Sequence, residues 1–108
     1  ENFLSNTSFS DLKAYHSILQ HLTSNFPNHK SEIINHKSPI NLHLGNSTPV
    51  RYAAYFNILQ NIHINSNRGV SGIDGTVSTA AGAAYENKKL TVLITGDLAF
   101  MYDSNALW

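Results

Sequence analysis

The chain has 108 residues, 42% of them hydrophobic, which is enough for one small domain with a modest core. Seven basic and seven acidic side chains give a formal net charge of zero, so no basic field predicts nucleic-acid binding. The absence of cysteine excludes disulfides and thiolate metal sites, which fits a cytoplasmic protein. No apolar run approaches the roughly 20 residues of a membrane span, and the first residues lack the pattern of a signal peptide.

Residues 1–39 differ in composition from the rest of the chain, being rich in Ser, Asn and His and free of glycine. Within this segment, Ser8 or Ser10 can cap a helix over residues 11–22, and Pro27 is expected to close it. The apolar side chains of this helix recur at helical spacing: Leu12, Tyr15, Leu19 and Leu22. We interpret residues 1–39 as a lead-in helix and linker.

From residue 40 the pattern changes to alternating strands and helices. The expected elements are a strand at 40–44, a helix from Thr48, a strand at 62–64, a loop at 65–72, a helix at 74–85 and a strand at 90–95. Pro49 occupies the first helical position, where proline is favoured. This order predicts an α/β fold with a parallel β-sheet flanked by helices.

The element order also predicts where a ligand would bind. Parallel strands joined by right-handed crossovers place their carboxyl ends at one edge of the sheet, where such folds bind ligands. The segments that leave the strands at this edge are residues 45–47, 67–69 and 96–97. At the end of the chain, residues 104–108 read as the first turn of a helix with Asp103 or Ser104 as N-cap, so we expect a truncated domain.

The chain contains two arginines, and both follow predicted strand ends. Arg51 lies one turn into the first helix of the sheet region, and Arg68 lies in the second loop. A guanidinium group binds carboxylates or phosphates with two parallel hydrogen bonds, so the pair suits a substrate with more than one carboxylate. The alternative is two surface arginines, one of them paired with Glu86 or Asp74.

Asp97 follows Gly96 at the end of an apolar strand that we expect to be buried and central in the sheet. A carboxylate there could supply one hard oxygen to magnesium, with ligand phosphates supplying others, or it could simply cap a helix. The glycine-rich loop at residues 69–75 is neither a dinucleotide fingerprint nor a P-loop, so alone it indicates only a turn that a ligand can approach. The six histidines show no metal-ligand spacing.

Three motifs in a fixed order carry a family resemblance. They are residues 45–51, residues 67–75 followed by 77–82, and residues 96–105. Together they resemble 2-succinyl-5-enolpyruvyl-6-hydroxy-3-cyclohexene-1-carboxylate synthase, an enzyme of menaquinone (vitamin K2) biosynthesis. The resemblance covers residues 42–108, and it implies that residues 40–108 are part of a thiamine-diphosphate-binding domain.

Members of that family bind thiamine diphosphate and Mg²⁺ (or Mn²⁺). They are transferases that decarboxylate 2-oxoglutarate and add the succinyl unit to isochorismate. The resemblance implies the same small-molecule substrates for the full-length protein, which would be a homodimer or homotetramer.

The resemblance also implies roles for individual residues. Asp97 would ligate the magnesium ion, Ile73 would wedge beneath the cofactor, and the Gly72 carbonyl would receive its aminopyrimidine. The expected substrate contacts are Ser47, Arg51 and Arg68. The expected cofactor contacts are Ser47, Ser71, Gly72, Ile73, Gly96, Asp97, Leu98 and Ala99. Leu98 stands where related thiamine enzymes have glycine, and Ala99 stands where the family often has serine.

Two parts of such an active site lie outside this sequence. The glutamate that activates the cofactor belongs to a separate N-terminal domain of the partner subunit, and the second magnesium motif would follow Trp108. We therefore assign no catalytic residue to the chain and expect it to be inactive alone and to self-associate. Two alternatives are another thiamine-diphosphate-dependent decarboxylase or carboligase, and a non-catalytic α/β phosphate-binding module.

Overall fold

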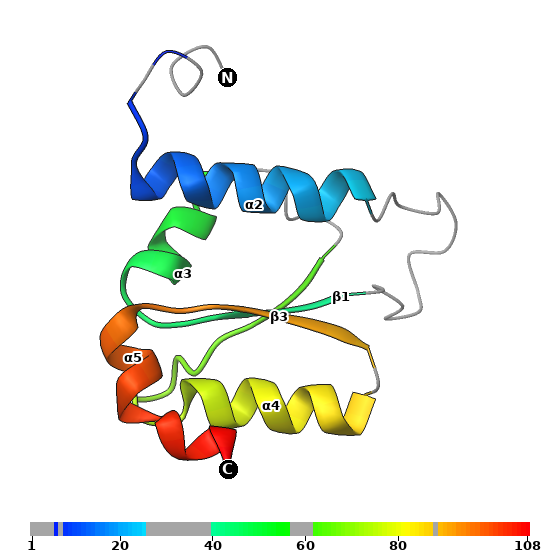
Figure 1. Ribbon diagram of the computed structural model, residues 1–108, viewed down its shortest axis with the longest axis vertical. Helices are drawn as coiled ribbons and strands as arrows, with labels where there is room; N and C mark the ends of the chain where they lie inside the picture. The colour runs from blue at the N-terminus through cyan, green and yellow to red at the C-terminus, as the bar shows by residue number, and fades with distance from the viewer. Residues whose placement is uncertain (1–5, 7, 26–39, 57–61, 88) are drawn as a thin grey trace.

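The computed structural model describes residues 6, 8–25, 40–56, 62–87 and 89–108 (Figure 1). The elements are α2 (Asp11–Asn25), β1 (Ile40–Leu44), α3 (Thr48–Ala53), β2 (His63–Asn65), α4 (Thr76–Asn87), β3 (Leu90–Ile94), α5 (Asp97–Tyr102) and the 3₁₀ helix η2 (Ser104–Leu107). The predicted alternation of strands and helices is confirmed. Within the described ranges, no helix is long and apolar enough to cross a membrane.

The three strands form one parallel sheet in the order β2-β1-β3, so β1 is the middle strand. Its register places Leu42 beside Ile64 on one side and Val92 on the other. Helices α2 and α3 cover one face of the sheet and α4 covers the other, which gives three layers (Figure 1). The parallel α/β architecture predicted from element order is therefore correct.

The expected position of the strand before Asp97 is wrong. Among the described strands, β3 pairs only with β1 and lies at the edge of the sheet. Because it has one neighbour, its side chains are exposed or only half-buried, and Leu90 is 49% exposed. The strand is apolar, as expected, but it is neither central nor fully buried.

Several element boundaries differ from the expected ones by one or two residues. Strand β2 begins one residue later than expected, and α4 starts at Thr76 rather than Asp74. The first helical bond of α4 runs from the Thr79 amide to the Gly75 carbonyl, so the two glycines before the helix stay in the loop. Helix α5 was not expected as a separate element. At α2, the Ser10 hydroxyl accepts a hydrogen bond from the Lys13 amide, which confirms one of the two candidate caps.

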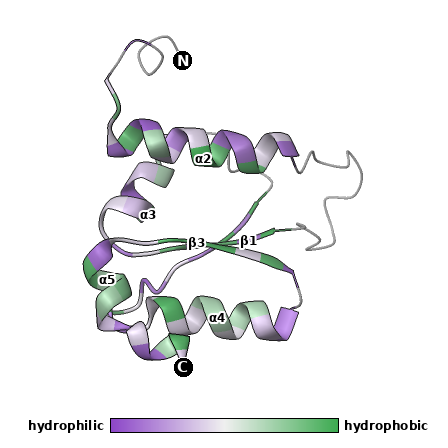
Figure 2. Cartoon of the chain, in the orientation of Figure 1, coloured by the Kyte–Doolittle hydropathy of each residue, from purple (hydrophilic) through white to green (hydrophobic). Residues whose placement is uncertain are grey.

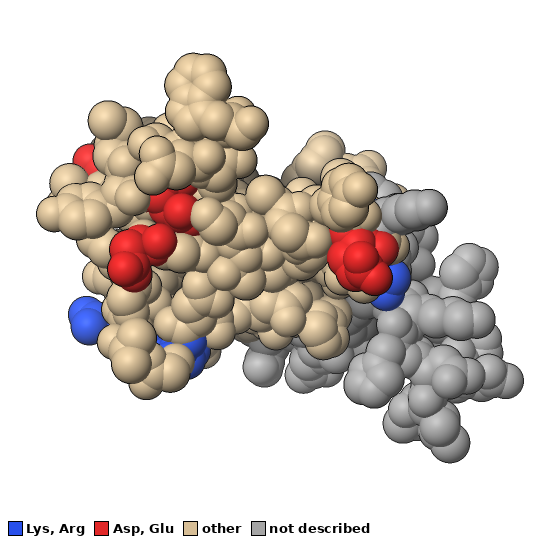
Figure 3. Space-filling model, turned by 90° about the horizontal axis from the view of Figure 1, so that it is seen from below, with Lys and Arg blue, Asp and Glu red and all other residues tan. Residues whose placement is uncertain are grey.

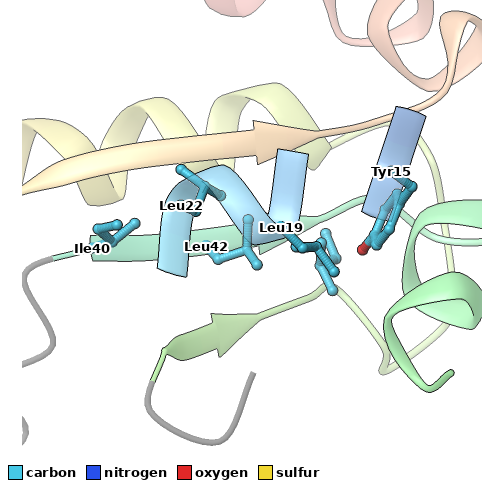
Figure 4. Packing of buried hydrophobic residues seen from close by; sticks show 6 residues of the cluster. Tyr15, Leu19, Leu22, Ile40 and Leu42 are labelled. Carbon is cyan, nitrogen blue, oxygen red and sulfur yellow. The ribbon is translucent and has the colours of Figure 1, made fainter. Parts of the chain in front are cut away.

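The hydrophobic core lies between α2 and β1. Its buried members are Tyr15, Leu19, Leu22, Ile40, Leu42 and Leu44 (Figure 4). Along α2, hydrophilic and hydrophobic residues alternate at helical spacing, as expected for a helix with one buried face (Figure 2). The expected stripe of this helix is confirmed for its three buried members, which all belong to the core. Pro27, which is expected to close this helix, lies outside the described residues.

Candidate functional site

The carboxyl ends of β1 and β3 are packed directly against each other. The Gly45 amide donates a hydrogen bond to the Ile94 carbonyl at 2.8 Å, which continues the pairing of the strands. A Cβ atom at position 45 would lie 2.8 Å from the Thr95 hydroxyl oxygen and 3.1 Å from the Thr95 Cα. Only glycine allows this approach, so Gly45 lets the ends of β1 and β3 pack closely at the predicted ligand edge.

Two serines in the strand-end loops adopt strained backbone conformations. Ser47 has φ 71° and ψ −123°, and Ser71 has φ 54°. They are the non-glycine residues with positive φ in the part of the chain that the structure describes. Such conformations cost of order 1–3 kcal/mol each and cluster at ligand sites, where the surrounding structure holds them. Both serines are among the residues predicted to contact a cofactor.

The second loop is tied to the end of β1 by hydrogen bonds. The Ser66 hydroxyl donates to the Leu44 carbonyl at 2.7 Å. The Asn67 amide group donates to the Gly75 carbonyl and to the Thr79 hydroxyl, both at 3.1 Å. These bonds close residues 66–75 into a compact loop that begins at β2 and ends at the start of α4.

Asn46 joins the first loop to the second. Its side chain is buried, with 6% of the residue exposed. Its Nδ2 donates to the Asn67 carbonyl at 2.9 Å and to the Gly72 carbonyl at 2.7 Å, and its Oδ1 accepts from Arg68 Nη1 at 2.9 Å. Sequence reasoning placed this asparagine at the ligand edge but gave it no role, because hydrogen bonds across 21 to 26 residues leave no local pattern.

Asp97 is the first residue of α5 and is exposed. Its Oδ1 accepts a hydrogen bond from the Leu98 amide at 2.8 Å. It lines a cavity of about 540 Å³ together with α2, the start of α3 and the residues that follow β3. Thr48 and Pro49, which directly follow the first loop, also line this cavity. Asp97 therefore faces a space beside the start of α3 that residues 45–47 and 67–73 do not line, and its role as a metal ligand stays a prediction.

The other predicted cofactor residues surround the same edge with different degrees of exposure. Gly72 and Ile73 are half-buried, whereas Ala99 is buried, with 5% exposed. Leu98 is 65% exposed. The Gly72 carbonyl already accepts one hydrogen bond from Asn46, which leaves its second lone pair for a ligand.

The two arginines have different surroundings. Arg68 is held at Asn46, so its guanidinium group lies at the turn between β1 and α3. Arg51 lies in the last turn of α3 and is exposed. The structure thus brings Arg68 to the first loop, and a pocket shared by both arginines stays a prediction.

A metal ion at Asp97 would need ligands from elsewhere. In the ranges described above, no group of three or more His, Cys, Asp or Glu side chains is placed to hold a metal ion. Two carboxylates, those of Asp11 and Asp97, line the cavity, and in the expected arrangement a diphosphate and a second motif supply the other oxygens around Asp97.

Asp103 has a structural role that the sequence interpretation missed. Its buried carboxylate accepts hydrogen bonds from the Ser78 amide and the Ser78 hydroxyl, both at 2.6 Å. These bonds hold the pKa of the Asp103 carboxyl below its ordinary value. Asp103 precedes η2, as expected for an N-cap, but its side chain makes no capping bond there and instead caps α4. An aspartate and a serine in a first helical turn, 25 residues apart, give no local signal for this pairing.

Charged side chains make up 13% of the sequence. On the face seen from below, acidic and basic groups form isolated spots in a largely uncharged surface (Figure 3).

No family model matches the chain. The relatives that do match are consistent with each other and with the motifs at the strand ends.

Three curated relatives carry the name 2-succinyl-5-enolpyruvyl-6-hydroxy-3-cyclohexene-1-carboxylate synthase. The protein from Christiangramia forsetii is 43% identical over 108 residues, covering 100% of this chain. Those from Flavobacterium psychrophilum and Porphyromonas gingivalis are 45% and 44% identical, each over 98% of this chain. By sequence, the chain belongs to this synthase family. It spans 16–17% of the length of these three relatives, so it corresponds to a small part of such an enzyme.

Proposed function

We propose that the chain is part of a thiamine-diphosphate- and magnesium-dependent synthase that decarboxylates 2-oxoglutarate and adds the succinyl unit to isochorismate. The supporting observation is that three loops carrying the family motifs meet at one edge of the sheet. Two of them are joined by the Asn46 side chain, and the third brings Asp97 to the adjoining cavity. Residues 40–108 would then be part of the cofactor-binding domain, with residues 1–39 as its lead-in helix and linker.

Thiamine diphosphate, when bound, supplies the carbanion chemistry that removes carbon dioxide from a 2-oxo acid. The residues of this chain would hold and orient it. Asp97 would give one hard oxygen to the magnesium ion at the diphosphate, and the half-buried Ile73 would supply apolar support. Ser47, Ser71, Gly72, Gly96, Leu98 and Ala99 would complete the contacts of this chain with the cofactor.

The arginines would recognise the substrates, since 2-oxoglutarate and isochorismate both carry two carboxylates. Arg68 is supported in this role because its guanidinium group is already oriented by a buried acceptor. Arg51 lies on the helix that begins at the same turn. Ser47 would face the reacting carbons from that turn, where its strained backbone presents an exposed side chain.

The chain alone would be inactive in this proposal. The activating glutamate and the second magnesium motif would come from other parts of the full-length protein and from its partner subunit. A cytoplasmic homodimer or homotetramer is the corresponding prediction for that protein. Another thiamine-diphosphate carboligase would share the Asp97 site but would have no use for two arginines at this edge.

Calorimetric titration of thiamine diphosphate into the full-length protein with Mg²⁺ tests the proposal. Asp97→Asn keeps the shape of the side chain and removes its charge, so we expect at least about tenfold weaker cofactor binding, as for loss of a charged contact. The matched control is Glu86→Gln, an exposed carboxylate near the end of α4, which should bind normally. Equal affinities of the Asp97→Asn variant and the unmodified protein would refute the metal role.

A further inference from the structure

The Asn46 side chain joins two loops through three of the four hydrogen bonds that an amide group can make. Both hydrogens of the amide nitrogen and the carbonyl oxygen are engaged, at 2.7 to 2.9 Å, with partners in residues 67–72. The residue is 6% exposed, so water does not replace these bonds easily. A buried amide that bonds three partners specifies one arrangement of those partners.

The backbone that carries Asn46 is itself rigid. On one side, Gly45 is bonded to Ile94 and packed against Thr95 without room for a Cβ atom. On the other side, Ser47 is held in a strained conformation before α3 begins with Pro49 in its first turn. The amide group of Asn46 therefore extends from a turn whose backbone is held by the ends of β1 and β3.

We propose that Asn46 is a positioning residue, which sets the guanidinium group of Arg68 and the backbone of residues 67–72 against the end of β1. The bonds from Asn46 to the Asn67 and Gly72 carbonyls support its role in positioning the loop. The bond that it accepts from Arg68 Nη1 supports its role in positioning the guanidinium group. The catalytic consequence rests on the proposed function, because there Arg68 binds a substrate carboxylate and the Gly72 carbonyl meets the cofactor.

The two halves of this role can be separated by substitution. Asn46→Asp keeps the shape and the acceptor for Arg68, and the added charge strengthens that bond. It also replaces the two N–H donors with a carboxylate oxygen that would face the Asn67 and Gly72 carbonyls. Asn46→Ala removes all three bonds. The aspartate variant should thus loosen the loop and keep the hydrogen bond from Arg68. The alanine variant should loosen the loop and also lose the bond from Arg68.

Hydrogen exchange in the full-length protein measures how often the loop opens. We expect amides in residues 68–73 to exchange about tenfold faster in both variants, since the loss of one or more buried hydrogen bonds changes local opening by about that factor. Asn65→Asp is the matched control, because it makes the same chemical change at the neighbouring strand end. It should leave the loop unchanged. Unchanged exchange in Asn46→Ala would overturn the proposal.

Steady-state kinetics measures whether Arg68 is still positioned to bind substrate. In Asn46→Ala, the KM for 2-oxoglutarate or isochorismate should rise about tenfold, toward the value of Arg68→Ala, whereas Asn46→Asp should stay closer to the unmodified enzyme. Equal KM values in Asn46→Ala and the unmodified enzyme, with Arg68→Ala impaired, would overturn the positioning of Arg68. A general loss of structure would instead speed exchange in β1 and α2 and would affect the alanine and aspartate variants alike.

Failure of the proposed function has a different signature. If neither Arg68→Ala nor Asn46→Ala changes the kinetics with these substrates while loop exchange still accelerates, Asn46 positions the loop but the substrate assignment is wrong. The exchange result thus tests the inference, and the Arg68→Ala kinetics test the function on which its catalytic part depends.

Discussion

The two faces of the middle strand have opposite chemistry. On one face, Ile40, Leu42 and Leu44 pack beneath α2. On the other, Asn41 and His43 lie on the side of α4, next to the β2 residues that share their register. All five residues of β1 are nevertheless buried. The apolar face gains free energy from burial, whereas the polar face must satisfy its groups within the protein.

The polar face satisfies those groups only in part. His43 Nε2 is buried and has no hydrogen-bond partner in the structure. A cavity of about 300 Å³ lies on this face, lined by Asn41, His43, His63, Asn65, Ala83, Asn87 and Lys89. Strands buried on both faces of parallel sheets are usually apolar throughout. The comparison therefore teaches that the apolar face supplies the stability and that the polar face reduces it.

The largest expected effect is on the apolar face. Leu42 is completely buried, so Leu42→Ala should lower the free energy of unfolding by about 2–5 kcal/mol through lost burial and the cavity left behind. Hydrogen exchange of the β1 amides in the full-length protein measures this change. Leu90→Ala on β3, where the side chain is 49% exposed, should cost much less. Equal costs at the two positions would break the comparison.

The adjacent residue should respond in the opposite direction. His43→Leu replaces a buried imidazole that has an unpaired nitrogen with an apolar side chain of similar size, so we expect a gain of up to about 1 kcal/mol. The same exchange measurement applies. His21→Leu, on the exposed side of α2, should change little. A loss above about 1 kcal/mol in His43→Leu would show that the imidazole makes a stabilising contact in solution.

The smallest expected effect is a dependence on pH. Burial, followed by the nearby His63, lowers the pKa of His43 below its ordinary value of 6.5. The folded state then binds fewer protons than the unfolded state, so stability is full above pH 6.5 and is lost as the pH falls below it. Besides His63, Lys89 is the charged side chain that lines the cavity.

The slope for this single group cannot exceed about 1.4 kcal/mol per pH unit. Unfolding measured between pH 5 and 7.5 should show the acid-side loss in the unmodified protein and a smaller loss in His43→Leu. Parallel pH profiles of the two proteins would contradict a lowered pKa at His43.

The fold was predictable where local pattern decides it. Helical spacing located α2, and the change to alternation located β1. The strand order was not predictable, because nothing in residues 62–65 states on which side of β1 they pair. The burial of all five residues of β1 was not predictable either, because it depends on the packing of α4 on the second face of the sheet.

The candidate site shows the same division. The order of the strands placed the loops of Gly45, Arg68 and Asp97 at one edge, and the hydrogen bonds from Gly45 to Ile94 and from Arg68 to Asn46 agree with that expectation. The roles of Asn46 and Asp103 were missed because each depends on partners at least 21 residues away. Such bonds follow from the packed fold and not from the spacing of residue types.

The strained backbone of Ser47 means that stability and the proposed substrate contact favour different residues at position 47. Glycine at this position would relieve a conformation that costs of order 1–3 kcal/mol in other residues. It would also delete the hydroxyl group that we propose to face the substrate. A directed-evolution experiment that selects this protein for heat resistance alone should therefore enrich glycine at position 47, and a selection for menaquinone-dependent growth should remove it again.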